Sequence, residues 1–304
     1  MMKEITGILL DTKRFAVHDG PGIRTAFFTK GCPLKCLWCH NPESISKLPE
    51  MGFYPHLCRQ CGKCAALCPA DAHLTEQGGH IFKKEVCLTC GQCETECPGN
   101  AMKLYGKEVS VAEAFALALE DRDFYEESGG GVTVSGGEPL LQKEFVFELF
   151  KALKAEGIHT ALDTCAFVSQ SALAEMLSVT DLFLVDFKHA DSFKHRQLTG
   201  VPNEVIKSNL KFLSDSGVFI EIRIPFVPGC NSDAENMEAS GAFLGQLNVG
   251  KVKLLPYHAL ARNKYAALQM EDTMPRAETP SEKEMAQALD ILKKYGLDVH
   301  SGRE

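Results

Sequence analysis

The sequence predicts an α/β protein in which a parallel sheet with crossover helices is interrupted by a cysteine-rich insertion. Short β-branched runs alternate with amphipathic helical stretches along most of the 304 residues, a pattern typical of strands joined by crossover helices. Eleven of the thirteen cysteines lie between residues 32 and 97. This uneven distribution marks a separate module within the α/β domain.

Six strands are predicted along the chain. They cover residues 23–31, 131–135, 159–164, 182–188, 218–226 and 251–257. Between the later strands lie stretches such as 143–157 and 203–217, which have apolar residues at helical spacing and end in glycine. Six β/α units are too few to close an eight-stranded barrel, so the pattern leaves an open partial barrel and a doubly wound sheet as alternatives.

The insertion divides the chain into three predicted segments. Residues 1–47 begin the α/β domain, residues 48–107 form a loop-like, cysteine-dense insertion, and residues 108–304 complete the domain.

Composition excludes several classes of function. A formal net charge of -8 gives no basic field for holding a nucleic-acid backbone. No segment approaches the ~20 apolar residues that span a bilayer, and the N-terminal apolar run is too short for a signal peptide. We therefore expect a cytoplasmic protein whose spaced cysteines bind metal, with neither nucleic acid nor membrane as a partner.

The insertion contains two runs with the spacing C-x2-C-x2-C-x3-C-P, which is that of bacterial ferredoxins. The runs are Cys58, Cys61, Cys64 and Cys68, then Cys87, Cys90, Cys93 and Cys97. In this arrangement the fourth cysteine of each run reaches the other cluster, so Cys97 is expected to join the first three and Cys68 to join the second three. Structural zinc is the alternative, but zinc ligand pairs are usually separated by a longer loop. The spacing favours two electron-transferring 4Fe-4S clusters.

A different cysteine pattern follows the first predicted strand. Cys32, Cys36 and Cys39 have the spacing C-x3-C-x2-C and offer one thiolate fewer than a four-iron cluster requires. An open coordination position is where a metal centre binds its substrate. We therefore interpret these residues as ligands of a catalytic cluster with one free iron.

Polar residues and glycines occur at or near the ends of the later strands. They are Gly136 and Gly137, Asp163, Asp186 and Lys188, Arg223 within the fifth strand, and His258 after the sixth. Each of these residues alone is weak evidence for a binding site, since an isolated Asp or His after a strand is usually a cap or a surface residue. Together at one sheet edge they suit a zwitterion: an ammonium group near the glycines and an Asp, and a carboxylate near Lys188 and Arg223. Such a ligand could complete the free iron.

Four motifs resemble those of a known family. The stretches "KGCPLKCLWCHNPES" and "SGGEP" look like those of radical S-adenosylmethionine (SAM) enzymes. "DGPGIR" and "LLPYH" are similar to motifs of the activating enzymes of glycyl radical enzymes, and the doubled ferredoxin run resembles the activases of dehydratases, decarboxylases and lyases. The resemblance implies a partial (β/α)6 TIM-type barrel with an inserted ferredoxin-like domain.

The resemblance also implies a role for each matching residue. Cys32, Cys36 and Cys39 would hold the cluster that binds SAM, and Trp38 and His40 would line the adenine side. Gly136, Gly137 and Glu138 would meet the methionyl amino end, while Asp163, Asp186 and Lys188 would contact the methionyl and ribose parts. His258 would pack near the ribose or adenine, and Asp19 and Arg24 lie where the family receives its peptide substrate.

The implied cofactors are three 4Fe-4S clusters and SAM. The implied reaction is reductive cleavage of SAM to methionine and a 5'-deoxyadenosyl radical, which takes a hydrogen atom from a glycine of a partner glycyl radical enzyme. A low-potential donor such as flavodoxin or ferredoxin would supply the electron.

The sequence departs from some relatives at Cys165-Ala166, where they have Asn-Gly. We interpret Cys165 and Cys230 as packing residues, because an isolated buried cysteine is usually inert. Two other functions are alternatives: a radical SAM enzyme acting on another peptide or a small molecule, and an iron-sulfur electron carrier. "DGPGIR" and "LLPYH" disfavour the first, and the open three-cysteine site disfavours the second.

Overall fold

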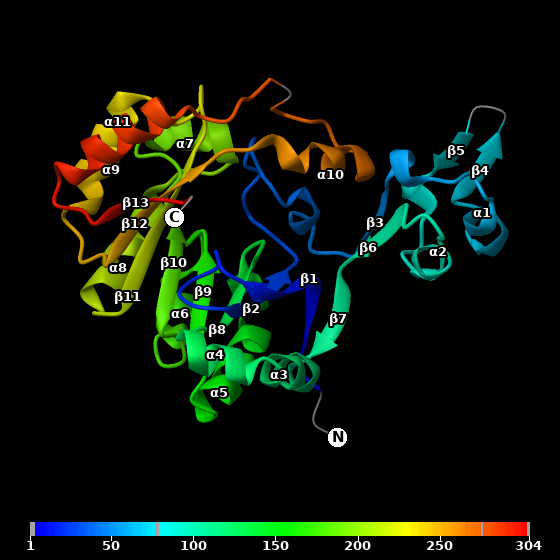
Figure 1. Cartoon of the computed structure of the whole chain (residues 1–304), viewed down its shortest axis with the longest axis horizontal. Coiled ribbons are helices and arrows are strands. Elements are labelled where there is room, and N and C mark those ends of the chain that lie inside the picture. The colour runs from blue at the N-terminus through cyan, green and yellow to red at the C-terminus, as the bar shows by residue number, and fades with distance from the viewer. Residues whose placement is uncertain (1–3, 77–78, 275, 303–304) are drawn as a thin grey trace.

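The computed structural model describes residues 4–76, 79–274 and 276–302, and within them the largest sheet has nine strands in the order β13-β12-β11-β10-β9-β8-β2-β1-β7 (Figure 1). The strands are β1 (Thr6–Ala16), β2 (Arg24–Thr29), β7 (Lys107–Ser110), β8 (Gly131–Gly136), β9 (His159–Thr164), β10 (Leu182–Asp186), β11 (Phe219–Phe226), β12 (Lys251–Pro256) and β13 (Val299–Ser301). Strand β2 and strands β8 to β13 are parallel, whereas β1 is antiparallel to both β2 and β7.

The six predicted strands are confirmed as β2 and β8 to β12, adjacent in the sheet in chain order. This arrangement is an α/β fold consistent with a partial TIM barrel, and it removes the doubly wound alternative, which would reverse the strand order within the sheet. Strands β1, β7 and β13 were not predicted. Their places at or near the edges depend on pairing with distant segments, which local sequence patterns do not report.

The α-helices of the barrel domain follow the strands. They are α3 (Val111–Leu119), α4 (Arg122–Ser128), α5 (Lys143–Ala155), α6 (Gln170–Met176), α7 (Ser192–Thr199), α8 (Glu204–Asp215), α9 (Ala234–Leu244), α10 (Arg262–Ala267) and α11 (Glu282–Lys293). Single 3-10 turns are η1 (Pro42–Ser44), η2 (Pro55–Leu57), η3 (Lys84–Val86), η4 (Pro139–Gln142) and η5 (Ala259–Ala261). The two helical stretches named from the sequence are confirmed as α5 and α8.

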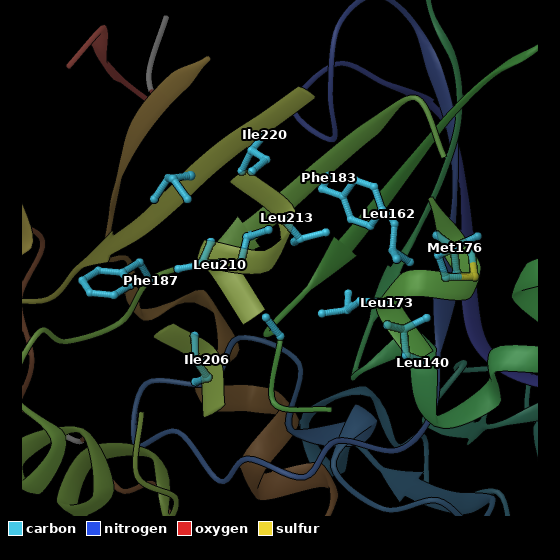
Figure 2. Packing of buried hydrophobic residues seen from close by; sticks show 14 of the residues in the cluster. Leu140, Leu162, Leu173, Met176, Phe183, Phe187, Ile206, Leu210, Leu213 and Ile220 are labelled. Atoms are coloured by element: carbon cyan, nitrogen blue, oxygen red, sulfur yellow. The ribbon is translucent and has the colours of Figure 1, made fainter. Parts of the chain in front are cut away.

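One face of the parallel strands forms the main hydrophobic core. Because successive side chains of a strand point to opposite faces, Val132 and Val134 of β8 and Leu162 of β9 share this face and pack against the helices. Figure 2 shows Leu173 of α6 and Leu210 of α8 among the core side chains. Burial of this apolar surface holds the strands in register.

The alternate residues of the same strands form a polar interior face. Their side chains include Thr133, Ser135, Asp163, Asp186, Glu221 and Arg223. Several of them bond to one another across strands, as Ser135 does to Asp163. The sheet therefore separates an apolar outer layer from an interior able to receive a charged ligand.

The insertion has more regular structure than the loop-like segment expected. Strand β3 (Glu50–Phe53) pairs antiparallel with β6 (Met102–Tyr105), and β4 (His73–Glu76) pairs with β5 (Gly79–Phe82). Two short helices, α1 (Lys63–Leu67) and α2 (Gln92–Thr95), complete it. In Figure 1 these elements form a lobe beside the barrel.

Over the described part of the chain, no helix has both the length and the apolar character needed to cross a bilayer.

Candidate active site and cluster cavities

The loop after β2 carries Cys32, Cys36 and Cys39 and is held by main-chain hydrogen bonds. The amide of Cys32 donates to Ile45 O (3.2 Å), and the amide of Cys39 donates to Cys36 O (3.1 Å). The three thiols lie within electrostatic range of one another. They therefore gather at the carboxyl end of β2.

Burial makes two of the three thiols, those of Cys36 and Cys39, difficult to ionise without a positive partner. It raises the pKa of Cys36 to about 12 and that of Cys39 to about 11. Iron-sulfur ligation requires thiolates. The donor set therefore fits three ligands of a four-iron cluster, whose positive irons would stabilise the ionised sulfurs.

Two residues of helix α10, which lies more than 220 positions later in the chain, form hydrogen bonds with the cysteine loop. Lys264 Nζ donates to His40 O (3.1 Å), to Asn41 Oδ1 (3.0 Å) and to the buried Glu43 (2.6 Å). Tyr265 donates its hydroxyl proton to Cys39 O (2.9 Å). Sequence reasoning missed both residues, because nothing local marks contacts to a loop more than 220 positions away.

Cys165 is buried, but it is not an isolated packing residue. Its thiol lies near two acceptors, Glu138 Oε2 (3.0 Å) and the sulfur of Cys32, and its single proton can be donated to only one of them at a time. Donation to Cys32 lowers the pKa of Cys32, and the same contact and burial raise the pKa of Cys165. Cys165 therefore lies beside a predicted cluster ligand, where its proton can be donated to Cys32 or to Glu138.

The carboxylate of Glu138 is fully engaged inside the protein. It is 0% exposed and accepts from the hydroxyl of Thr164 (2.8 Å) and the amides of Cys165 (2.9 Å) and Leu140 (3.1 Å). Burial raises its pKa. Its side chain therefore joins the ends of β8 and β9 rather than projecting toward a ligand.

The two glycines before Glu138 are required by close packing of strand ends. A Cβ on Gly137 would lie 2.1 Å from Gly31 O, and one on Gly136, where φ is +108°, would lie 2.5 Å from Thr29 N. Any side chain would push β8 away from β2 and from the cysteine loop that follows it. The glycines therefore bring the two strand ends together.

The charged residues at the later strand ends form a connected set. Arg223 lies 3.4 Å from the Asp163 carboxylate, and Lys188 pairs with Asp186 at 2.5 Å. Burial raises the pKa of Asp163 to about 6, against the opposing effect of Arg223. Burial also opposes the charge on Lys188, but Asp186 and Cys36 outweigh it and raise its pKa.

Two histidines stack beside the cysteine loop. The rings of His40 and His258 lie 4.1 Å apart at 26°. Burial lowers the pKa of His40 to about 4, so the ring is neutral. Its Nε2 atom is buried without a hydrogen-bond partner among the described residues, which marks a position where a ligand could bond. Trp38 is buried nearby against Val227 and Tyr257.

Asp19 and Arg24 have different environments. Arg24 is 0% exposed, and its guanidinium donates to Thr133 Oγ1 (2.6 Å), Val132 O (2.7 Å) and Pro21 O (3.2 Å). It therefore braces the "DGPGIR" loop internally and offers no free donor to a peptide. Asp19 is partly exposed and lies within electrostatic range of Arg24.

The insertion has two partly open cavities lined by cysteines. Cys58, Cys61, Cys64 and Cys97 line the first cavity. Cys68, Cys87, Cys90 and Cys93 line the second cavity, with Cys64 also at its wall. Each cavity thus offers the four thiols that a 4Fe-4S cluster needs.

Comparisons with known proteins identify the family of this chain. A model of the radical SAM superfamily matches residues 27–238. The trans-4-hydroxy-L-proline dehydratase activating enzyme of Clostridioides difficile is 39% identical over 97% of this chain and 99% of the relative. The benzylsuccinate synthase activating enzyme of Thauera aromatica is 41% identical over 97% and 92%. In fold alone, the chain is similar to Streptococcus suis SuiB bound to its precursor peptide SuiA (TM-score 0.54, 12% identity, 91% of this chain and 47% of that one).

Proposed function

Because this chain belongs to the radical SAM superfamily and, within it, to the activating enzymes of glycyl radical enzymes, we propose that the barrel interior binds SAM and that the insertion carries two further 4Fe-4S clusters. The single observation that supports the SAM site best is the gathering of three cysteines, stacked histidines and paired charges at one edge of the sheet.

The proposed cluster ligands are Cys32, Cys36 and Cys39. A bound cluster would supply one electron to the sulfonium of SAM, whose carbon-sulfur bond then breaks to give methionine and a 5'-deoxyadenosyl radical. The radical takes a hydrogen atom from the α-carbon of a glycine in the partner, leaving 5'-deoxyadenosine and a glycyl radical.

The chain's own residues would bind and orient SAM. Asp163 and Asp186 offer carboxylates to its ammonium and hydroxyl groups, while Lys188 and Arg223 offer cations to its carboxylate. His40, whose buried Nε2 has no hydrogen-bond partner in the described part of the chain, and His258 would hold the adenine side.

Glu138 and Arg24 are assigned positioning roles, because all their polar atoms bond within the protein or are buried. Asp19, with its partly exposed side chain, is the better candidate for contact with the partner's peptide.

The proposed electron path enters through the insertion. Two cavities with four thiols each support two fully ligated clusters, which can relay electrons but have no free iron. The donor would be a small one-electron carrier of the flavodoxin or ferredoxin type. A reducing cytoplasm suits all eleven thiolates.

Isotope transfer tests the proposed hydrogen abstraction. A partner glycyl radical enzyme containing α-deuterated glycine is mixed anaerobically with the reduced protein and SAM, and the 5'-deoxyadenosine is examined by mass spectrometry. We expect one deuterium in the product. Unlabelled 5'-deoxyadenosine in every turnover would favour a different substrate. Iron analysis of the same sample should give about twelve irons per chain.

A further inference from the structure

Two histidines of the insertion lie between its two cavities and are not explained by cysteine ligation. His73 Nδ1 lies 2.9 Å from His80 Nε2, and His80 Nδ1 lies 3.5 Å from Cys58 Sγ. His80 lines the first cavity, whereas His73 lines the second. The pair therefore links the wall of the second cavity, at His73, to the Cys58 thiol of the first cavity.

The two halves of the insertion are related by a shift of 29 residues. Moving 29 residues forward carries the first cysteine run onto the second and His73 onto Met102, and moving 29 residues back carries Phe82 onto Phe53, so the register pair His73 and Phe82 corresponds to Met102 and Phe53. Strands β4 and β5 thus correspond to β6 and β3.

Main-chain hydrogen bonds to the sulfurs obey the same symmetry. Cys58 accepts from the amide of Gln60 (3.4 Å) and Cys87 from that of Thr89 (3.4 Å). Cys68 accepts from Ala72 (3.3 Å) and Cys97 from Ala101 (3.2 Å). The main chain therefore donates equivalent hydrogen bonds to the sulfurs of both proposed clusters.

The histidines break this symmetry. The counterpart of His80 is Met51, which lines the second cavity, and the counterpart of His73 is Met102, which lines the first. Imidazole can donate an N–H to sulfur, whereas a thioether cannot. Only the first cavity has such a side-chain donor at this position.

The direction of the hydrogen bonds follows from donor chemistry. A cluster thiolate accepts only, and His80 faces two of them: Nδ1 lies 3.5 Å from Cys58 Sγ, and Nε2 lies 3.7 Å from Cys64 Sγ. The shorter contact assigns the proton of a neutral ring to Nδ1, and Nε2 then accepts from His73 Nδ1 at 2.9 Å. This protonation is assigned from the contacts. His73 thereby fixes the orientation of the ring that donates to Cys58.

A single metal ion shared by Cys64, His73 and His80, whose ligand atoms lie within 4.8 Å of one another, fits the geometry less well. Two nitrogens on one tetrahedral zinc would lie about 3.3 Å apart. The 2.9 Å separation of the rings is a hydrogen-bond distance. Cys64 also lines the first cavity together with three other thiols.

We propose that His80, oriented by His73, is a positioning residue that donates a hydrogen bond to Cys58 and makes the first-cavity cluster easier to reduce than the second. Hydrogen bonds to the sulfurs are among the factors that set cluster potentials, and a donor stabilises the extra negative charge of the reduced form. One electron from the external carrier would therefore reduce the first-cavity cluster in preference to the second. This step transfers no proton and breaks no bond. This inference rests on the two insert clusters of the proposed function.

The test is an anaerobic redox titration of the reconstituted full chain, followed by electron paramagnetic resonance (EPR). Wild type should show two different insert-cluster potentials, and the higher one should belong to the cluster lost in Cys61→Ala. His80→Met, which copies Met51, should lower that potential toward the other one. His56→Met, an exposed histidine in the same lobe, should change neither.

Unchanged potentials in His80→Met, with iron still near twelve per chain, would overturn the role of His80 and leave the proposed clusters standing. If His80→Met fails to assemble its cluster, Met51→His replaces it and should raise the lower potential; no rise would equally contradict the inference. Wild-type protein with about four irons or with stoichiometric zinc would instead end the proposal of insert clusters itself.

Discussion

At the scale of single residues, Cys36 distinguishes the proposed catalytic cluster from those of the insertion. Cys36→Ala removes one of three ligands from a cluster that has none to spare, so we expect loss of 5'-deoxyadenosine formation. Iron should fall by about four per chain while the insert signals persist in EPR. Cys230→Ala is the matched control for ligation, since Cys230 contacts Met274 (3.9 Å) and is not among the predicted ligands, although it packs in the same cluster as Trp38; its iron content should match wild type. SAM cleavage by Cys36→Ala would refute the ligand assignment.

The carboxyl group of Asp163 gives the binding site an expected pH dependence. Burial raises its pKa to about 6, above its usual range, so the group is ionised above pH 6 and protonated below it. Since the ionised form would hold the ammonium group of SAM, affinity should fall as pH drops through about 6. Asp163→Asn should bind SAM weakly at pH 7 and show little change from pH 7 to 5.

Equilibrium binding of SAM to the anaerobic protein measures this effect. Asp215→Asn, at an exposed position at the end of α8, should retain the wild-type profile. A wild-type affinity that is flat from pH 7 to 5 would show that the carboxylate of Asp163 does not hold the ligand.

Residue types with an intrinsic chemistry were the ones that could be predicted from sequence. Spaced cysteines indicate metal ligation from the sequence alone, so Cys32, Cys36 and Cys39 could be predicted as ligands, and the structure brings their thiols near one another. The environments of Glu138 and Arg24 could not, because their full burial depends on partners that distant segments supply, such as Thr164 and Thr133. The contact between Cys165 and Cys32 belongs to the same class.

At the scale of elements, the junction of β2 and β8 should tolerate no side chain. Gly137→Ala would place a Cβ 2.1 Å from Gly31 O, and the strand ends would have to separate. We expect a loss of roughly 1–3 kcal/mol in unfolding free energy, seen as a lower melting temperature of the anaerobically reconstituted protein. Iron retention in the catalytic cluster should also fall.

A control substitution at Gly157 tests whether the expected destabilisation in Gly137→Ala comes from crowding of the new Cβ rather than from replacing a glycine in general. Gly157 has φ of +74° but nothing within 4 Å of a new Cβ. Gly157→Asn should change the melting temperature little, because Asn tolerates the left-handed region. Equal melting temperatures for Gly137→Ala and wild type would contradict the crowded junction.

The central elements were predictable because their pattern is local. Buried parallel strands read as short β-branched runs, and the predicted range 159–164 coincides with β9. Strand β1 was missed because its pairing with β2 and β7 is set by distant residues. In the insertion, regular structure was missed because cysteine spacing reports ligation, not the antiparallel pairs β3–β6 and β4–β5.

At the scale of the whole molecule, the chain combines a barrel with a polar interior and a lobe with two cysteine-lined cavities. The three-cysteine loop follows β2, and the lobe follows that loop in the chain, so the proposed ligand site and the proposed electron-transfer clusters occupy adjoining segments. The charge of -8 disfavours a strongly acidic docking face on the partner. The family supports a glycyl radical enzyme as the partner, and the proposed function adds an electron donor as a second partner.

The most direct test of the central claim is an EPR measurement of the partner after anaerobic mixing. The reduced protein, SAM and a glycyl radical enzyme served by a relative of this chain are combined, and the spectrum is recorded. The account predicts a glycyl radical in the partner that is absent without SAM and absent with Cys36→Ala. Abundant 5'-deoxyadenosine with no glycyl radical in any such partner would contradict it.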